Sequence, residues 1–251
     1  LLRTKNSKSD HLSFANGPLL VQGSSQPVTS GHYEEKDGKV VVFTYNGNLK
    51  YTRWKIYGSG WVELEYEYTL DGEFPFAGIS FSYPENFMLG TKWLGKGPYR
   101  QWKNRQRGTP VNVWSNLYNN TQTGYSPLQY PEFKGYYGDI SWMEFSTAEG
   151  KFYVASKDKG LHIRLFDFYG LTGVKPHPEL PAGNISFLDC IPPIGTKLAL
   201  NISYNTAALG PQSELTKISG PVKRSLFFFF GLPKTDNREE TYSRPAVDNV
   251  F

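Results

Sequence analysis

Apolar and polar residues alternate along much of the first half of the chain, as they do in β-strands with one buried face. Residues 61–70 (WVELEYEYTL) are the clearest case, because Val62, Leu64 and the tyrosines point one way and three glutamates point the other. Similar runs occupy residues 40–45, 49–57 and 74–83, separated by the turn sequences NG, GSG and DG at 46–47, 58–60 and 71–72. We therefore predict a meander of antiparallel strands with one solvated face.

Further strand patterns follow in the second half of the chain, and no segment has the period of a three-turn helix. They occupy residues 140–145, 151–156, 161–168, 185–190, 197–204 and 225–230. So many strands in a chain of 251 residues exceed an immunoglobulin-type sandwich and fit a larger one. We predict an all-β fold, a large antiparallel sandwich formed by residues 1–230, with the polar residues 231–251 as a tail or surface strap.

Composition narrows the class of protein further. Aromatic residues reach 16%, and 25 Gly and 17 Pro fit strands separated by turns. The net charge of +4 is too small to indicate a polyanionic partner by itself, and the single Cys190 excludes an internal disulfide framework. No run approaches the roughly 18–20 apolar residues of a membrane-spanning helix. The sequence opens at Leu1 with no methionine and no signal-peptide pattern, so it is either processed or a piece of a longer polypeptide, and we expect the second. We expect an extracytoplasmic location.

Residues 93–114 (WLGKGPYRQWKNRQRGTPVNVW) contain three Trp, five cations and no acid. The segment from 93 to 138 is rich in Gly, Pro, Asn and Tyr and has little periodicity, so we predict a long loop. Its many aromatic residues fit three interpretations: a sugar platform, a single-stranded nucleic-acid surface, or a loop packed onto the sheet. The modest net charge and the lack of any RNP-like or OB-type pattern argue against nucleic acid.

Candidate catalytic groups are few. The three glutamates of residues 61–70 lie along one strand face and cannot flank a glycosidic bond, as two catalytic carboxylates must. We expect Glu132 and Asp139 to anchor the loop, and His162 to cap a sheet face within an alternating strand. The four histidines have no metal-ligand spacing, and nucleophile elbows and phosphate loops are absent. We therefore expect no metal and no other cofactor.

A sugar platform would give the aromatic residues of this segment a physical role. A pyranose has a face of C–H groups that packs on an indole, while its hydroxyl groups need oriented polar partners. Trp114, at the end of the segment beside Asn112, suits such a platform. We expect Trp114, Trp102, Tyr99, Arg105 and Asn112 to bind substrate, and we expect Arg105 to tie the loop to the sandwich as well.

The order and spacing of these motifs resemble the C-terminal domain of glycoside hydrolase family 2 β-galactosidases. Residues 55–83 carry a strand pair around a GSG turn and lead to TKWLGKGPYRQWKNR at 91–105, which is similar to the family's Gly-x-Gly-Pro motif with its following aromatic residue and Arg. Trp114 follows that Arg by nine residues, at the position of a family Trp. Weaker similarity is found at residues 12–20 (LSFANGPLL) and 124–142, so the resemblance covers about residues 10–170.

This resemblance implies a galactose-mutarotase-like supersandwich, the fifth domain of a five-domain enzyme. In that family the catalytic glutamates lie on a separate (β/α)8 barrel, and the Trp that matches Trp114 reaches into the barrel's active site and stacks on the bound sugar. The chain alone is then expected to have no catalytic residue. Its expected partners are a galactoside-like carbohydrate and the catalytic barrel of the same parent polypeptide, with no nucleic acid and no membrane span.

Two other functions remain open from the sequence. A free-standing mutarotase or epimerase on the same sandwich would need a His acid and a Glu or Asp base in one pocket. A stand-alone carbohydrate-binding module would need an exposed aromatic patch that binds oligosaccharide without a barrel.

Overall fold

The computed structural model describes residues 27–74, 77–84, 87–117, 135–165, 185–191 and 215–231. These residues form twelve strands and contain no α-helix, so no helix in this part of the chain is long and apolar enough to cross a membrane. The strands are β1 (Thr29–Glu35), β2 (Gly38–Thr44), β3 (Leu49–Tyr57), β4 (Trp61–Phe74), β5 (Ala77–Phe81), β6 (Met88–Lys96), β7 (Val111–Leu117), β8 (Tyr136–Thr147), β9 (Gly150–Ser156), β10 (His162–Leu165), β11 (Ile185–Cys190) and β12 (Thr216–Phe229).

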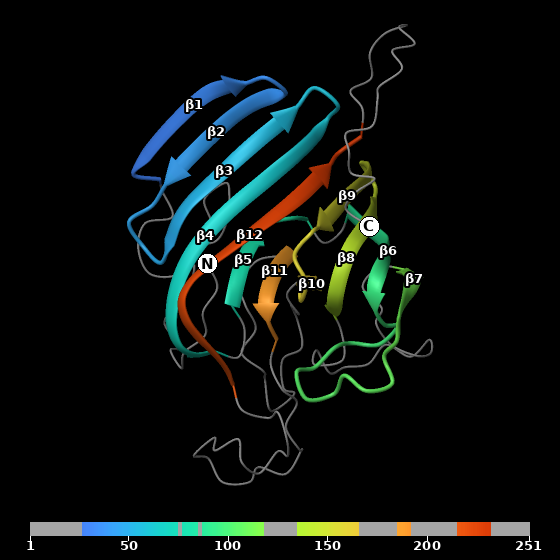
Figure 1. The fold of residues 1–251 in the computed structure, drawn as a ribbon. Helices are drawn as coiled ribbons and strands as arrows, with labels where there is room; N and C mark the ends of the chain where they lie inside the picture. The colour runs from blue at the N-terminus through green and yellow to red at the C-terminus, as the bar shows by residue number, and fades with distance from the viewer. Residues whose placement is uncertain are drawn as a thin grey trace, which may run out of the picture.

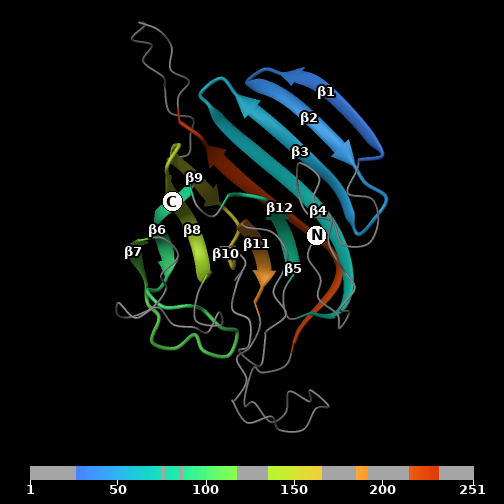
Figure 2. The same cartoon turned by 180° about the vertical axis from the view of Figure 1, so that it is seen from behind.

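All strand pairs are antiparallel, in the order β1-β2-β3-β4-β12-β9-β8-β10-β11-β5, with β6 pairing with β8 and β7 pairing with β6. The sheet curls, so that β5, β10 and β11 lie across from the long strands β3, β4 and β12 (Figures 1 and 2). The predicted all-β antiparallel sandwich is therefore confirmed.

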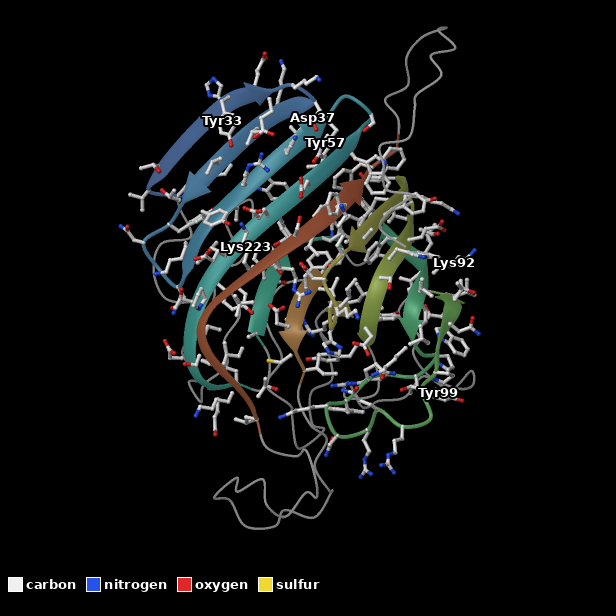
Figure 3. The ribbon with its side chains drawn as sticks, in the orientation of Figure 1. Tyr33, Asp37, Tyr57, Lys92, Tyr99 and Lys223 are labelled. Carbon is white, nitrogen blue, oxygen red and sulfur yellow. The ribbon has the colours of Figure 1, made fainter. Side chains whose placement is uncertain are left out.

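Strand β4 buries its apolar residues on one face, as its alternating pattern predicts. Leu64, Tyr66, Tyr68 and Leu70 are buried in the core. The intervening glutamates lie on the outer face, where they bond neighbouring strands. Tyr57 Oη donates to Glu63 at 2.7 Å, Tyr51 Oη donates to Glu65 at 2.8 Å, and Lys223 Nζ lies 3.1 Å from Glu65. Figure 3 shows Tyr57 and Lys223 on this face. Glu63 and Glu65 thus bond to neighbouring strands on the face that was predicted to be solvated.

Strand β12 is longer than its sequence pattern predicts, since it begins at Thr216 rather than at Ser225. Gly220 and Pro221 interrupt the first half of the strand, and both residue types lower strand propensity. Register with β4 overrides that propensity: β12 pairs with β4 along its whole length, from Thr216 opposite Phe74 to Phe229 opposite Trp61. The predicted strand at 197–204 and the predicted tail after Gly231 lie outside the described residues.

Aromatic rings from both layers meet in the core. The ring of Phe228 on β12 lies edge-on to Phe187 on β11 and to Phe81 on β5, with centroid distances of 5.7 and 6.3 Å. A buried polar contact joins the same layers, because Asp189 on β11 accepts from Tyr68 Oη at 2.5 Å and from Arg224 Nε at 2.6 Å. These contacts hold the curled sheet closed.

Candidate functional site

The segment predicted as one long loop, residues 93–138, contains the end of β6, all of β7 and the first residues of β8. Residues 93–96 end β6, residues 111–117 form β7, and only residues 97–110 connect them. The prediction of a loop from 93 to 138 is thus wrong for these residues. The alternation in β7 does not follow the usual rule that apolar residues face the core. Its valines point to the exposed outer side, while Asn112 and Trp114 point to the inner side. A pattern search that assigns apolar residues to the core misses such a strand.

Trp114 lies opposite Trp93 in the register of β6 and β7. Directly opposed residues of an antiparallel pair point to the same face, which here is the inner face. The Trp93 ring is fully buried, lies edge-on to Tyr137 at 4.7 Å between centroids, and its Nε1–H donates to the Lys96 carbonyl at 3.2 Å. Trp114 is half-buried and packs against the edge of the core. Trp93 is therefore part of the core, whereas Trp114 lies at the border of the core.

The Trp114 ring packs directly against the backbone of Gly97. A Cβ atom on Gly97 would lie 2.6 Å from Trp114 Cδ1 and 2.8 Å from Trp114 Nε1, closer than real Cβ contacts. The Nε1 atom is buried and has no hydrogen-bond partner among the described residues. On the same side of β7, Asn116 Oδ1 accepts from Thr91 Oγ1 at 2.6 Å. The strand around Trp114 is thus fixed by side-chain contacts to β6.

The connection between β6 and β7 packs onto the start of β8. The Arg100 guanidinium lies 3.4 Å from the ring centroid of Trp102 and 4.2 Å from that of Tyr136. Gln101 N–H donates to the Tyr136 carbonyl at 3.1 Å, and Thr109 Oγ1 donates to Gln101 Oε1 at 3.1 Å. Because Trp102 is only 9% exposed, this connection is an ordered segment with its central indole packed down.

Three of the predicted contact residues are more accessible. Tyr99 is 42% exposed, and Figure 3 shows it at the end of the molecule formed by the β6–β7 connection. Arg105 is exposed, and its backbone N–H donates to the Trp102 carbonyl at 3.0 Å. Asn112 is exposed on the same side of β7 as Trp114, and its Oδ1 accepts from the Val113 N–H at 2.8 Å. The structure therefore places Asn112 with Trp114 on β7, and Tyr99, Trp102 and Arg105 in the connection.

Part of the basic character of this segment is neutralised. Lys96 Nζ lies 2.6 Å from Asp139 Oδ2 and donates to Gln106 Oε1 at 2.8 Å. Asp139 has a φ of 47°, in the left-handed region, at the point where β8 bulges between its pairing with Lys96 and with Leu94. Asp139 thus anchors the hairpin, as predicted from the sequence. Glu132, the other predicted anchor, lies outside the described residues.

His162 is buried in β10 and does not cap an exposed face. Burial lowers the pKa of His162 to about 4, so the imidazole is neutral at physiological pH. Its Nδ1 atom has no hydrogen-bond partner among the described residues. Among the residues that the structure describes, no group of three or more His, Cys, Asp and Glu side chains could hold a metal ion.

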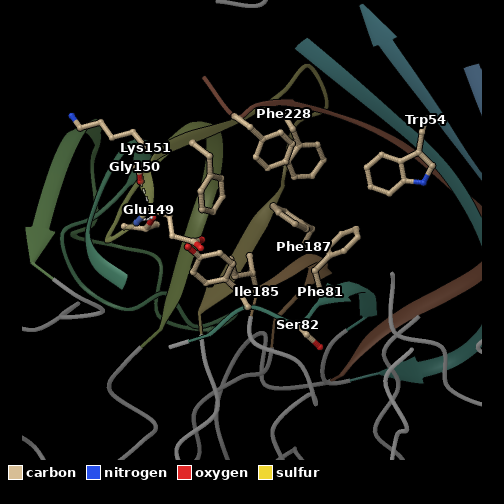
Figure 4. A pocket seen from close by; sticks show the side chains of 13 residues that line it. Trp54, Phe81, Ser82, Glu149, Gly150, Lys151, Ile185, Phe187 and Phe228 are labelled. Carbon is tan, nitrogen blue, oxygen red and sulfur yellow. Dashed lines mark hydrogen bonds between the residues drawn. The ribbon is translucent and has the colours of Figure 1, made fainter. Parts of the chain in front are cut away.

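A pocket of about 350 Å³ opens between the two layers, away from the hairpin. Its lining is mainly aromatic, with Trp54 at one end and Glu149 and Lys151 at the other (Figure 4). None of the five predicted contact residues lines it, and its lining contains one carboxylate and no histidine. The acid and base that an epimerase requires are therefore not brought together in this pocket.

Sequence reasoning missed the residues that position Trp114. Gly97 was part of a recognised motif, but its contact with a side chain seventeen positions later depends on the hairpin register. Thr91 and Asn116 meet for the same reason. The signal that could have found them is the spacing itself, since pairing 93 with 114 fixes every other pair of the hairpin.

Comparison with known families gives one informative match. The family model described as "Beta galactosidase small chain" matches residues 11–212, which is more than half of the chain. Comparison with curated proteins gives no match.

Proposed function

We propose, because the chain belongs to the beta-galactosidase small chain family, that it is an accessory carbohydrate-contacting domain of a family 2 glycoside hydrolase. In this proposal it completes the sugar site of a separate (β/α)8 catalytic barrel in the same parent polypeptide. The preferred sugar is a β-galactoside.

The observation that supports the proposal most is the placement of Trp114. Its ring is half-buried at the border of the core, with Gly97 against one part of it and Trp93 in the neighbouring strand. An indole held in this way loses little conformational entropy when it binds a ligand. Its accessible part can pack on the C–H face of a pyranose, as aromatic residues in carbohydrate sites do.

We assign polar contacts to the sugar hydroxyls to exposed side chains of β7 and of the β6–β7 connection. Asn112 offers an amide on the same side of β7, and Arg105 offers a planar set of N–H donors from the connection. Tyr99 adds an accessible phenol. Trp102 has little accessible ring area, so its contribution to the site is to hold the connection in shape under Arg100.

The catalytic acids belong to the barrel in this proposal. Among the described carboxylates, Glu63 and Glu65 bond to neighbouring strands, and Asp139 is paired with Lys96. A carboxylate engaged in this way serves the fold and is not poised to protonate a leaving group. The chain thus supplies binding contacts, and the barrel supplies proton transfer and the nucleophile.

The experiment that tests this function replaces Trp114 in the complete parent enzyme. With an aryl β-galactoside, we expect Trp114→Ala to lower kcat/KM by at least roughly tenfold, which corresponds to about 1.4 kcal/mol of lost stacking. Trp114→Phe should recover part of this loss, because a smaller aromatic face remains.

Trp61→Ala is the matched control, since Trp61 is also a half-buried indole but lies on the outer face of β4, with its ring centroid 5.2 Å from that of Phe229. Equal kinetics for Trp114→Ala and the unmodified enzyme, with a folded protein, would contradict the proposal. A stand-alone binding module would bind galactosides through Trp114 with the same affinity in the isolated chain and in the complete enzyme.

A further inference from the structure

We propose that the pocket between the two layers binds an organic cation, a ligand with a flat apolar body and a positively charged nitrogen. The pocket has a volume of about 350 Å³ and is lined by β3, β5, β9, β11 and β12 and by the connections that follow β5 and β8. Small-molecule sites in proteins have volumes of about 300–1,000 Å³ and mainly apolar walls. No residue of β6 or β7 lines this pocket, so the inference goes beyond the proposed function and does not depend on it.

Partly exposed aromatic rings are gathered around this one pocket. Trp54, Phe81, Tyr83 and Phe152 line it and are only partly buried, and Phe230 is 61% exposed. Single exposed apolar side chains are common on proteins, but a group of them around one hollow marks a binding site. The core does not need these ring surfaces, which leaves them available to a ligand.

The rings that form the walls hold one another in place. The Phe228 ring lies 6.2 Å from Trp54 and 5.9 Å from Phe230, measured between centroids, and the planes of Phe228 and Phe230 differ by only 2°. Phe152 continues the series, with centroids 5.9 Å from Phe230 and 5.6 Å from Tyr83. Walls that are already fixed lose little conformational entropy when a ligand binds.

Water inside the pocket finds few hydrogen-bond partners, because most of the lining is aromatic. Thr147 is a polar lining residue, but its Oγ1 already donates to the Gly150 carbonyl at 2.7 Å and accepts from the Glu149 N–H at 3.2 Å. A hollow with apolar walls holds water weakly. A ligand with an apolar body therefore gains free energy by replacing that water.

The charge at one end of the pocket indicates the charge of the ligand. Lys151 Nζ lies 2.8 Å from Glu144 Oε1, so the positive charge of this lining residue is balanced by a carboxylate outside the lining. No cation among the described residues pairs with the carboxylate of Glu149. Figure 4 shows Glu149 at the end of the pocket opposite Trp54. The pocket thus carries an unbalanced negative charge, which disfavours carboxylate and phosphate ligands.

Aromatic rings and a carboxylate both attract a cation, and sites for organic ammonium ions combine them. In this pocket the apolar body of the ligand lies between the layers on the side of Trp54, and its nitrogen lies toward Glu149. A sugar fits less well, since its hydroxyl groups need polar partners on several sides and the charged groups of this lining are all at one end.

Isothermal titration calorimetry of the 251-residue chain with three probes tests the proposal. The probes are naphthylmethylammonium, naphthylmethanol and naphthoate, which share a naphthalene ring and differ in charge. We expect the ammonium ion to bind roughly fivefold tighter than the alcohol at low salt, and the carboxylate to bind most weakly. Added salt should reduce the affinity for the ammonium ion and leave that for the alcohol unchanged.

Two variants locate the binding. Glu149→Gln should lower the affinity for the ammonium ion about threefold and leave that for the alcohol unchanged. Glu73→Gln is its matched control, because Glu73 is an exposed carboxylate of β4 outside the pocket lining, and we expect no effect. Phe230→Ala should lower both affinities at least roughly threefold, and the exposure of this ring makes the replacement safe for the fold.

Any of three results would overturn the proposal: no binding of the ammonium ion, equal affinity for the ammonium ion and the alcohol, or binding that neither Glu149→Gln nor Phe230→Ala changes. Loss of binding in Trp114→Ala would also overturn it, since the probe would then sit at the β6–β7 hairpin. Failure of the proposed function is distinguishable, because galactoside turnover that Trp114→Ala leaves unchanged has no bearing on probe binding at Glu149.

Discussion

The indole of Trp114 lies against the backbone of Gly97, so closely that no side chain fits between them. The contact explains part of the Gly-x-Gly-Pro motif. Gly95 is required by the backbone of β8, since a Cβ there would lie 2.7 Å from the Gly138 carbonyl oxygen, whereas Gly97 is required by a single side chain. Gly95 thus permits close packing of β6 on β8, and Gly97 permits close packing of the indole that we propose binds the sugar.

Gly97→Ala should displace the Trp114 ring with little effect on the rest of the hairpin. Gly97 has no left-handed φ, so the clash with the indole is the main cost. Overpacking of this kind costs roughly 1–3 kcal/mol. We expect Gly97→Ala to lower the free energy of unfolding by that amount alone, and to have almost no effect in a Trp114→Ala background. Urea unfolding of the four chains measures this coupling.

The matched control is Gly31→Ala, because nothing lies within 4 Å of a Cβ at Gly31 and its φ is ordinary. Additive effects of Gly97→Ala and Trp114→Ala would show that the ring does not rest on Gly97.

The Asp189–Arg224 pair should be the polar contact on which closure of the two layers depends most. Both side chains are about nine-tenths buried, and Tyr68 Oη donates to the same carboxylate. Removing one partner leaves a buried charge without compensation, which costs roughly 3–5 kcal/mol. We expect Asp189→Asn to lower the unfolding midpoint strongly, whereas Lys39→Met, which removes an exposed ion pair with Glu34, changes it little. Similar midpoints for the two variants would contradict the assignment.

The buried His162 should make stability depend on pH. Its pKa falls from 6.5 to about 4 on folding, so protons bind the unfolded chain more tightly. Stability is then fully present above pH 6.5 and is lost as pH falls from 6.5 toward 4. Between pH 7 and pH 5 the loss from this group is about 2 kcal/mol.

We expect His162→Gln to remove this part of the difference between urea unfolding at pH 7 and at pH 5. His32→Gln should leave the difference unchanged, because His32 is exposed on β1. An unchanged pH dependence in His162→Gln would show that another group is responsible.

The isolated chain should hydrolyse no aryl β-galactoside. Glu63, Glu65 and Asp139 bond to neighbouring strands, and the proposed catalytic acids lie on another domain. The release of nitrophenol by purified chain, measured over several hours, is expected to equal that of buffer. Turnover by the pure chain that Glu132→Gln abolishes would refute the division of labour between the two domains.

The fold could be predicted from the sequence where local pattern and burial agree. Strand β4 buries Leu64, Tyr66 and Tyr68 in strict alternation, so period and turns were enough to identify it. Strand β12 was found only in its second half, because Gly220 and Pro221 weaken a pattern that pairing with β4 restores. Such long-range pairing has no signal in a single local window.

The sequence could name candidate residues for the site, but it could not give their geometry. Spacing and family resemblance selected Trp114, yet the valines of β7 face solvent, which concealed the strand that carries the ring. The burial of Trp102 under Arg100 depends on how the connection folds over Tyr136, far along the sequence. Contacts of this kind follow from register and packing, which residue composition does not encode.

The central claim concerns one distance, between the Trp114 indole and a sugar bound in the complete enzyme. A crystal structure of the parent enzyme with a bound galactoside measures it directly. Our account predicts ring atoms of Trp114 within about 4.5 Å of the pyranose carbons, the range of an apolar contact. A saccharide bound in the catalytic domain with the Trp114 ring out of contact, or covered by its own domain, would contradict it.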